Sequence, residues 1–164
     1  MSPLHSFAPV SRADANILIL GSMPGKKSLA ENQYYAHPQN AFWKIMGDLI
    51  GANPGLPYDE QLNKLRSSRI ALWDVLASCT RETSLDSHIR QESANDFTSF
   101  FAQHPQIVRV FFNGSKAEQS FRKFVLNRQT LPPLEFRRLP STSPAHAGMR
   151  YTDKLQAWRA AMNL

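Results

Sequence analysis

The chain has 164 residues, of which 42% are hydrophobic and 20% are charged, so we expect a single domain, residues 1–164, with a sizeable core. A formal charge of +6 favours a polyanionic partner such as a nucleic acid, although many basic proteins bind none. The one cysteine, Cys79, excludes an intrachain disulfide, a cysteine-based zinc site and an iron–sulfur cluster built by this chain alone. Because neither an apolar leader nor a long apolar run is present, we expect a cytoplasmic protein without a membrane span.

Strand and helix patterns alternate along the first half of the chain. Residues 1–15 are polar and are predicted to form an extended lead-in. Residues 16–21 include four consecutive aliphatic residues, which is typical of a strand buried on both faces in a parallel sheet. Residues 22–39 are predicted as a loop with a short turn near Lys26. Helical spacing of apolar residues then runs from Asn40 to Gly51 and returns over residues 58–67, before a second apolar strand at 70–73.

The second half begins with a long polar loop over residues 78–93, which could carry function or be a plain connector. Helices are predicted over residues 94–104, 115–126 and 151–162, and the aromatic residues of the first are more typical of a core than of a cofactor site. Strands are predicted over residues 107–112 and 136–139. This alternation indicates an α/β fold, a three-layer α/β/α sandwich around a four-stranded, mainly parallel sheet.

Polar or glycine residues follow each predicted strand. They are, in chain order, the loop GSMPG (residues 21–25), Asp74, Asn113 and the loop STSP (residues 141–144). Because the carboxyl ends of parallel strands meet at one sheet edge, where open α/β sheets bind ligands, the sequence predicts a site at that edge. The glycine spacing of GSMPG matches neither the phosphate loop nor the dinucleotide fingerprint, and the motif alone would also suit an ordinary turn.

A second cluster, residues 34–43 with the sequence YYAHPQNAFW, places tyrosine, histidine and carboxamide side chains directly before a helix. Flat rings stack on flat ligands, and carboxamides hydrogen-bond base edges or water. The cluster therefore predicts a pocket for a planar, polar ligand. Two residues have ordinary alternatives, because Asn40 could simply cap the helix and His37 could be a loop residue beside a proline.

Together, GSMPG, YYAHPQNAFW, a strand ending LWDVL and the loop STSPAHAG resemble the uracil-DNA glycosylase superfamily, in particular its hypoxanthine-DNA glycosylase branch, over residues 16–158. The resemblance implies a compact α/β/α sandwich. It also implies a monofunctional DNA-repair enzyme that flips deaminated bases, most notably hypoxanthine in deoxyinosine, and hydrolyses the N-glycosidic bond. We expect a monomer whose partner is DNA containing deaminated bases, with no cofactor, no metal and no membrane.

Departures from other branches narrow this expectation. Met23 stands where the mismatch-specific uracil/thymine branch has an asparagine that positions water, and the aspartate of the commonest uracil-specific branch is also absent. The loop STSPAHAG, residues 141–148, is called the late loop below. It begins STSP where uracil-specific relatives usually have H-P-S, so uracil is not expected as the main substrate. A uracil or mismatch glycosylase, a non-catalytic nucleic-acid-binding module and, less in keeping with the charge, a nucleoside hydrolase are the alternatives.

Roles follow for individual residues. The resemblance assigns catalysis to Asn40, whose amide oxygen would hold a water toward C1′. Tyr35 would stack on the extruded base, and His37 would donate to N7 of hypoxanthine. Asp74 would accept from N1–H of the base, unless it caps the following turn. The other predicted residues are Gly21, Ser22, Met23, Pro24, Gly25 and Asn113 in the base pocket, and Ser141, Thr142, Ser143 and His146 on the DNA backbone.

Overall fold

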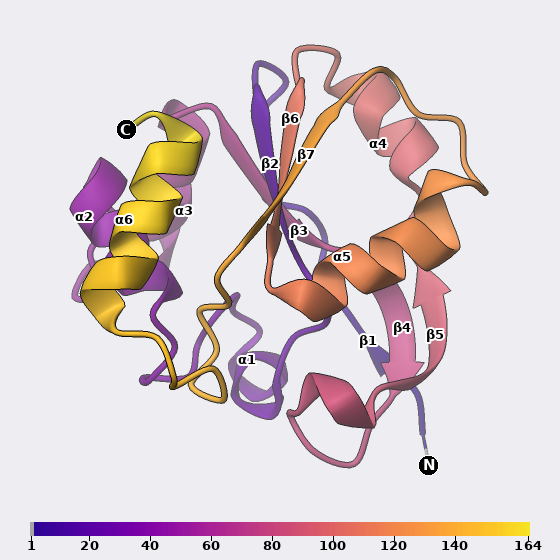
Figure 1. The fold of residues 1–164 in the computed structure, drawn as a ribbon, viewed down its shortest axis with the longest axis horizontal. Coiled ribbons are helices and arrows are strands. Elements are labelled where there is room, and N and C mark those ends of the chain that lie inside the picture. The colour runs from indigo at the N-terminus through magenta and orange to yellow at the C-terminus, as the bar shows by residue number, and fades with distance from the viewer. Residues whose placement is uncertain (1) are drawn as a thin grey trace.

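A four-stranded sheet with the order β3-β2-β6-β7 forms the centre of the molecule in the computed structural model, which describes residues 2–164 (Figure 1). Its strands are β2 (Ile17–Gly21), β3 (Ile70–Asp74), β6 (Arg109–Asn113) and β7 (Glu135–Leu139). Every neighbouring pair is parallel. The four predicted strands are confirmed, and all of their carboxyl ends lie at one edge.

Helices cover both faces of this sheet (Figure 1). One face carries α2 (Phe42–Ile50), α3 (Tyr58–Ser67) and α6 (Tyr151–Met162). The other carries α4 (Phe97–Gln103) and α5 (Ser115–Phe121), which continues into the π-helical turn η2 (Arg122–Leu126). Successive side chains of β2 alternate between two separate cores, because a strand points its side chains to opposite faces. The predicted three-layer α/β/α sandwich is confirmed.

A second sheet corrects the prediction of a loop over residues 78–93. It is three-stranded and antiparallel, with the order β1-β4-β5, and consists of β1 (Leu4–His5), β4 (Leu76–Thr80) and β5 (Arg90–Ala94). The loop that joins β4 to β5 contains a short 3-10 turn, η1 (Asp86–His88). Strand β5 is polar and mostly exposed, and its pairing with β4 is irregular. Its sequence therefore lacks the apolar alternation that predicts a strand, which is why it was predicted as a loop.

Other element boundaries also differ from the predictions. A short helix, α1 (Lys26–Glu31), lies within the stretch predicted as a loop. Helix α2 begins at Phe42, two residues later than predicted. Helix α4 begins at Phe97, because the Asp96 side chain accepts a hydrogen bond from the Ser99 amide at 3.0 Å and caps it there.

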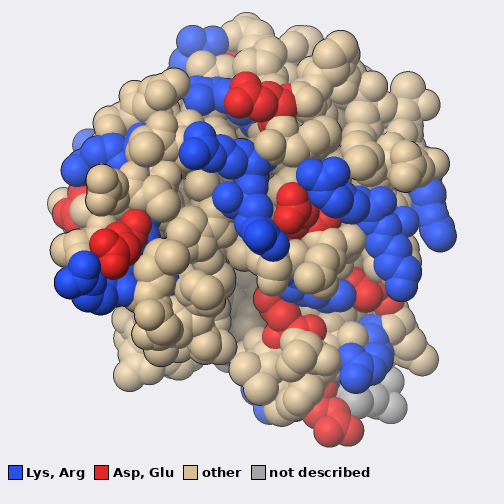
Figure 2. All heavy atoms as spheres, viewed as in Figure 1, with Lys and Arg blue, Asp and Glu red and all other residues tan. Residues whose placement is uncertain are grey.

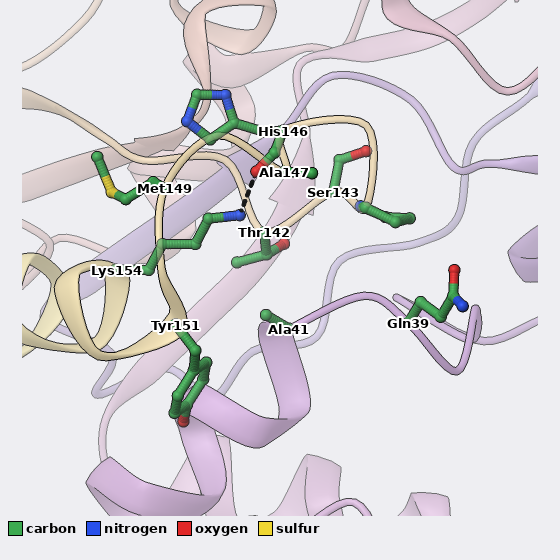
Figure 3. A pocket seen from close by; sticks show the side chains of 10 residues that line it. Gln39, Ala41, Thr142, Ser143, His146, Ala147, Met149, Tyr151 and Lys154 are labelled. Atoms are coloured by element: carbon green, nitrogen blue, oxygen red, sulfur yellow. Dashed lines mark hydrogen bonds between the residues drawn. The ribbon is translucent and has the colours of Figure 1, made fainter.

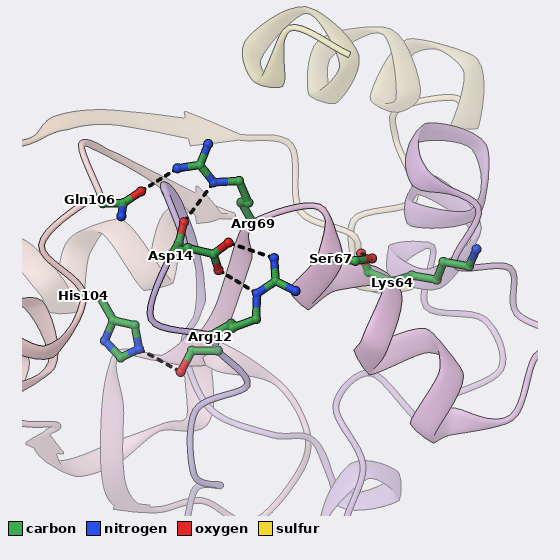
Figure 4. A network of polar contacts seen from close by, with 8 residues as sticks. Arg12, Asp14, Lys64, Ser67, Arg69, His104 and Gln106 are labelled. Atoms are coloured by element: carbon green, nitrogen blue, oxygen red, sulfur yellow. Dashed lines mark hydrogen bonds and ion pairs between the residues drawn. The ribbon is translucent and has the colours of Figure 1, made fainter.

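A polar network fastens the lead-in at the sheet edge opposite the strand ends (Figure 4). Arg12 pairs with the Asp14 carboxylate at 2.6 Å, and Arg69 donates to the Asp14 carbonyl and to the side chain of Gln106. The lead-in is thus tied to the start of β3, away from the predicted site. Within residues 2–164, no helix is long and apolar enough to cross a bilayer.

Candidate active site

A cavity of 590 Å³ opens where the carboxyl ends of β2, β3, β6 and β7 meet. In Figure 2 the surface is hollowed below the middle of this face, where in Figure 1 the loop before α6 faces the start of α5. We call this hollow the base cavity. It is lined by every residue of the predicted site: Gly21, Ser22, Met23, Pro24, Gly25, Tyr35, His37, Asn40, Asp74, Asn113, Ser141, Thr142, Ser143 and His146.

Gly21 ends β2 at the floor of the cavity. A Cβ atom at this position would lie 2.5 Å from Asp74 Oδ1 and 2.8 Å from the Tyr35 hydroxyl, so only glycine lets these two groups close over the strand end. The Tyr35 ring stacks on Phe42, with ring centroids 4.2 Å apart. Because one face of Tyr35 is already covered, a flat ligand could stack only on its other face.

Asp74 presents a buried carboxylate to the cavity. The residue is 4% exposed, and its Oδ2 atom has no hydrogen-bond partner among the described residues. Burial, with a smaller contribution from the nearby Asp86 carboxylate, raises the pKa of Asp74 to about 7. The amides of Val75 and Leu76 donate to the carbonyls of the GSMPG loop. The following turn is therefore held by main-chain bonds, and the Asp74 carboxylate is left facing the cavity.

Asn113 joins three parts of the site. Its Nδ2 donates to the Tyr35 hydroxyl at 3.1 Å and to Thr142 Oγ1 at 2.9 Å. Its Oδ1 accepts from the Thr142 amide at 2.9 Å. Both donors of the carboxamide are thereby used within the protein. Asn113 lines the cavity as predicted, and it also holds the late loop and the Tyr35 hydroxyl at fixed positions.

Asn40 lies just before α2 and also lines the base cavity. Its Oδ1 accepts from the Phe42 amide at 2.9 Å, so it satisfies the first amide of α2 from one residue before the N-cap, Ala41. The same residue lines the cavity, and the neighbouring Ala41 amide donates to the Thr142 carbonyl at 2.9 Å. Because a carbonyl oxygen has two lone pairs, the bond from the Phe42 amide leaves one acceptor site for a water.

His37 lies exposed at the cavity wall. Its Nδ1 accepts from the Gln39 amide at 3.1 Å. The neutral imidazole then carries its proton on Nε2, which is the form that can donate to a base nitrogen.

Residues from the loop between β4 and β5 form one wall of the cavity, and the sequence did not single them out. Ser22 Oγ donates to Asp86 Oδ1 at 2.7 Å, and the Lys26 amide donates to Ser84 Oγ at 2.8 Å. The buried Arg81 donates to the Pro24 carbonyl. These contacts hold the loop between β4 and β5 against the GSMPG loop. The only signal in the sequence was a polar segment after the second strand, which is too general to identify a wall.

Charge is unevenly distributed around the base cavity. The carboxylates of Asp74 and Asp86 line it, whereas Lys26, Lys27 and Lys116 line it from the neighbouring helix starts. Carboxylates suit ligand groups that donate hydrogen bonds, and lysines suit phosphates. No group of three or more His, Cys, Asp or Glu residues that could hold a metal ion occurs within residues 2–164.

Comparison with known proteins adds independent information. The model of the uracil DNA glycosylase superfamily matches residues 8–163. Curated relatives named hypoxanthine DNA glycosylase, from Methanosarcina barkeri and Methanosarcina acetivorans, are 39% and 41% identical over 114 residues, which is 69% of this chain and 72% of each relative. The solution NMR structure of a candidate uracil DNA glycosylase from M. acetivorans superimposes with a TM-score of 0.79 at 34% identity, and the match covers 97% of this chain and 96% of that one.

Proposed function

The chain belongs to the uracil DNA glycosylase superfamily, and from this premise we propose that it is a DNA-repair glycosylase that removes hypoxanthine from deoxyinosine in DNA. One observation carries the proposal. A single cavity brings together the amide of Asn40, the buried carboxylate of Asp74 and the hydroxyls of the late loop. Two relatives named hypoxanthine DNA glycosylase support the choice of base. A DNA substrate places the enzyme inside the cell, and one chain supplies every residue of the site.

Binding begins with extrusion of the damaged nucleotide, because the glycosidic bond is out of reach inside the duplex. The hydroxyls of Ser141, Thr142 and Ser143 hold the backbone beside the cavity, and Lys26 and Lys116 add positive charge at its edge. The base enters between these groups and stacks on the open face of Tyr35. Stacking of this kind contributes ~1–3 kcal/mol per base.

Asp74 distinguishes hypoxanthine from adenine. Hypoxanthine presents N1–H as a donor, whereas adenine presents a lone pair at N1, and an ionised carboxylate can only accept. The Asp74 Oδ2 atom is buried and without a partner among the described residues, so it is available to the base. An adenine in the same position would leave this carboxylate unpaired, which costs ~1–3 kcal/mol or more.

Bond cleavage places positive charge on the sugar and negative charge on the departing base. Asn40 cannot act as a strong base, because a carboxamide does not ionise in this range, but it can orient a water toward C1′. His37 can donate a hydrogen bond from Nε2–H to N7 of the purine and so stabilise the departing base. In their ionised forms, the Asp74 and Asp86 carboxylates that line the cavity favour the cationic sugar over the neutral one.

An excision panel tests the proposal. Labelled duplexes that carry inosine, uracil, xanthine or thymine are incubated with the protein and then cleaved with alkali at abasic sites. We expect cleavage of inosine duplexes, with activity retained in EDTA. Intact inosine DNA alongside cleaved uracil DNA would assign the chain to a uracil-specific branch, and loss of activity in EDTA would contradict the metal-free mechanism.

A further inference from the structure

A second pocket of 260 Å³ lies beside the base cavity, between the late loop and the starts of α2 and α6 (Figure 3). It shares Thr142, Ser143, Pro144 and His146 with the base cavity. The two hollows are therefore separated by little more than the late loop itself. A nucleotide extruded into the base cavity has backbone phosphates on both sides, so a neighbouring pocket is in position to receive one of them.

Lys154 gives this pocket its charge. The residue is 6% exposed, and its ammonium donates to the His146 carbonyl at 2.7 Å (Figure 3). It forms no ion pair with any described residue, and burial lowers its pKa. No aspartate or glutamate lines the pocket. A buried ammonium without a counter-ion is costly, and two of its three N–H groups have no partner among residues 2–164.

The hydroxyls around the pocket are also free to donate. Thr142 Oγ1 accepts from Asn113, and Ser143 Oγ accepts from the Ala145 amide at 3.2 Å. Each hydroxyl uses an acceptor site in these bonds and keeps its own proton. The pocket therefore presents a cation and hydroxyl donors without any opposing carboxylate, which is the chemistry that recognises a phosphate.

We propose that the second pocket binds a DNA backbone phosphate next to the extruded nucleotide, with Lys154 as its cation. This inference rests on the proposed function, because it takes the phosphate from the DNA that the base cavity engages. The same lysine also holds the late loop through the His146 carbonyl, so occupation of the pocket fixes the loop in the position that the lesion requires.

The experiment distinguishes a Lys154 that binds a phosphate from a Lys154 that only supports the late loop through the His146 carbonyl. Lys154→Gln keeps a donor for the His146 carbonyl but removes the charge, and Lys154→Met removes both. Arg159→Met, an exposed position on the same helix, is the matched control. Binding is measured on duplexes with one abasic-site analogue, in which backbone linkages around the lesion are replaced one at a time by neutral methylphosphonate.

We expect the wild type and Arg159→Met to lose ~10-fold in affinity when one particular linkage beside the lesion is neutralised. Lys154→Gln should bind the unmodified duplex ~10-fold more weakly, lose nothing further at that linkage, and show a salt slope smaller by about 1. Wild-type affinity of Lys154→Gln, or losses that simply add at every linkage, would overturn the proposal and leave Lys154 as a support for the late loop. Stabilisation of the wild type by inorganic phosphate, without linkage dependence on DNA, would also overturn it.

Because the assay measures binding to an abasic-site analogue, its result does not depend on which base is excised. A linkage-specific loss in a protein that leaves inosine DNA intact would refute the proposed base and keep the phosphate site. Melting curves of both Lys154 variants test whether the compared proteins are folded. If Lys154→Met is unstable, the comparison of Lys154→Gln with the wild type decides the outcome.

Discussion

A methyl group added to Gly21 tests how the floor of the base cavity is built. The Cβ atom of an alanine would lie 2.5 Å from Asp74 Oδ1 and 2.8 Å from the Tyr35 hydroxyl, which is closer than real Cβ atoms approach. Gly21 is not among the glycines with positive φ, so the backbone itself accepts an alanine. The penalty therefore comes from the clash alone, and the carboxylate or the hydroxyl must move.

The expected loss of stability follows from the displacement of the Asp74 carboxylate or the Tyr35 hydroxyl. Overpacking a buried position by a methyl group costs ~1–3 kcal/mol, and displacement of the Tyr35 hydroxyl also weakens its bond from Asn113. For a domain of this length, such a loss lowers the melting temperature by roughly 2–10 °C. Because Asp74 is the group proposed to accept from the base, we expect the single-turnover excision rate on inosine DNA to fall ~10- to 100-fold.

Calorimetric melting and single-turnover excision measure the two effects. Gly55→Ala is the matched control, because a Cβ at Gly55 meets nothing within 4 Å. That variant should melt at or slightly above the wild-type temperature and excise at the wild-type rate. A Gly21→Ala protein that behaves like Gly55→Ala in both measurements would refute the arrangement of Asp74 and Tyr35 over the strand end.

Further predictions concern three other residues of the cavity. Asn40→Ala should lower the single-turnover excision rate ~100-fold at nearly unchanged DNA affinity, and the loss of its bond to the start of α2 should cost ~1 kcal/mol of stability. An excision rate within a few-fold of wild type would show that Asn40 only stabilises the start of the helix. Because the pKa of Asp74 is raised from 3.8 to about 7, its ionisation destabilises the fold, so the free energy of unfolding in urea should fall by on the order of 4 kcal/mol as the pH rises through that window, and Asp74→Asn should make the slope shallower. Around pH 7, where the native Asp74 carboxyl ionises, the preference for inosine over adenine should rise with pH in excision assays, because a protonated Asp74 can donate to adenine N1. A preference that stays flat across this pH would show that Asp74 does not read the base. Asn113→Ala removes three hydrogen bonds and should cost ~2 kcal/mol in urea denaturation, and unchanged stability would contradict its bridging role.

The central sheet and the residues that line the cavity were predictable because the buried strands carry two signals in the sequence: an apolar run, and a glycine or polar residue where the run stops. Ile17–Gly21 is a run of aliphatic residues that stops at a glycine, and Ile70–Asp74 stops at a carboxylate. Parallel pairing then brings the ends of these strands to one edge without further information. Residues 92 positions apart, Gly21 and Asn113, therefore line one cavity as expected from the sequence.

The second sheet and the bonds inside the site were not predictable, because both depend on partners distant in the chain. Strand β5 is polar and is held in place by pairing with β4 rather than by its own pattern. The wall around Asp86 was missed for the same reason. The carboxamide of Asn113 reaches Tyr35, 78 residues away, and nothing in the local sequence of either residue indicates that bond.

A sheet in which every neighbouring pair is parallel cannot form from adjacent segments of the chain. Pairing between such distant segments is slow, since each contact must first overcome the entropy of closing a long loop. The edge strand β7 (Glu135–Leu139) comes last along the chain and carries the late loop with it. Under the proposed function, a chain that has not yet docked this strand holds Gly21 and Asp74 but lacks the groups proposed to hold the DNA backbone, Thr142 and Lys154. On that proposal, the order of the strands delays DNA binding at the base cavity until the last strand has docked.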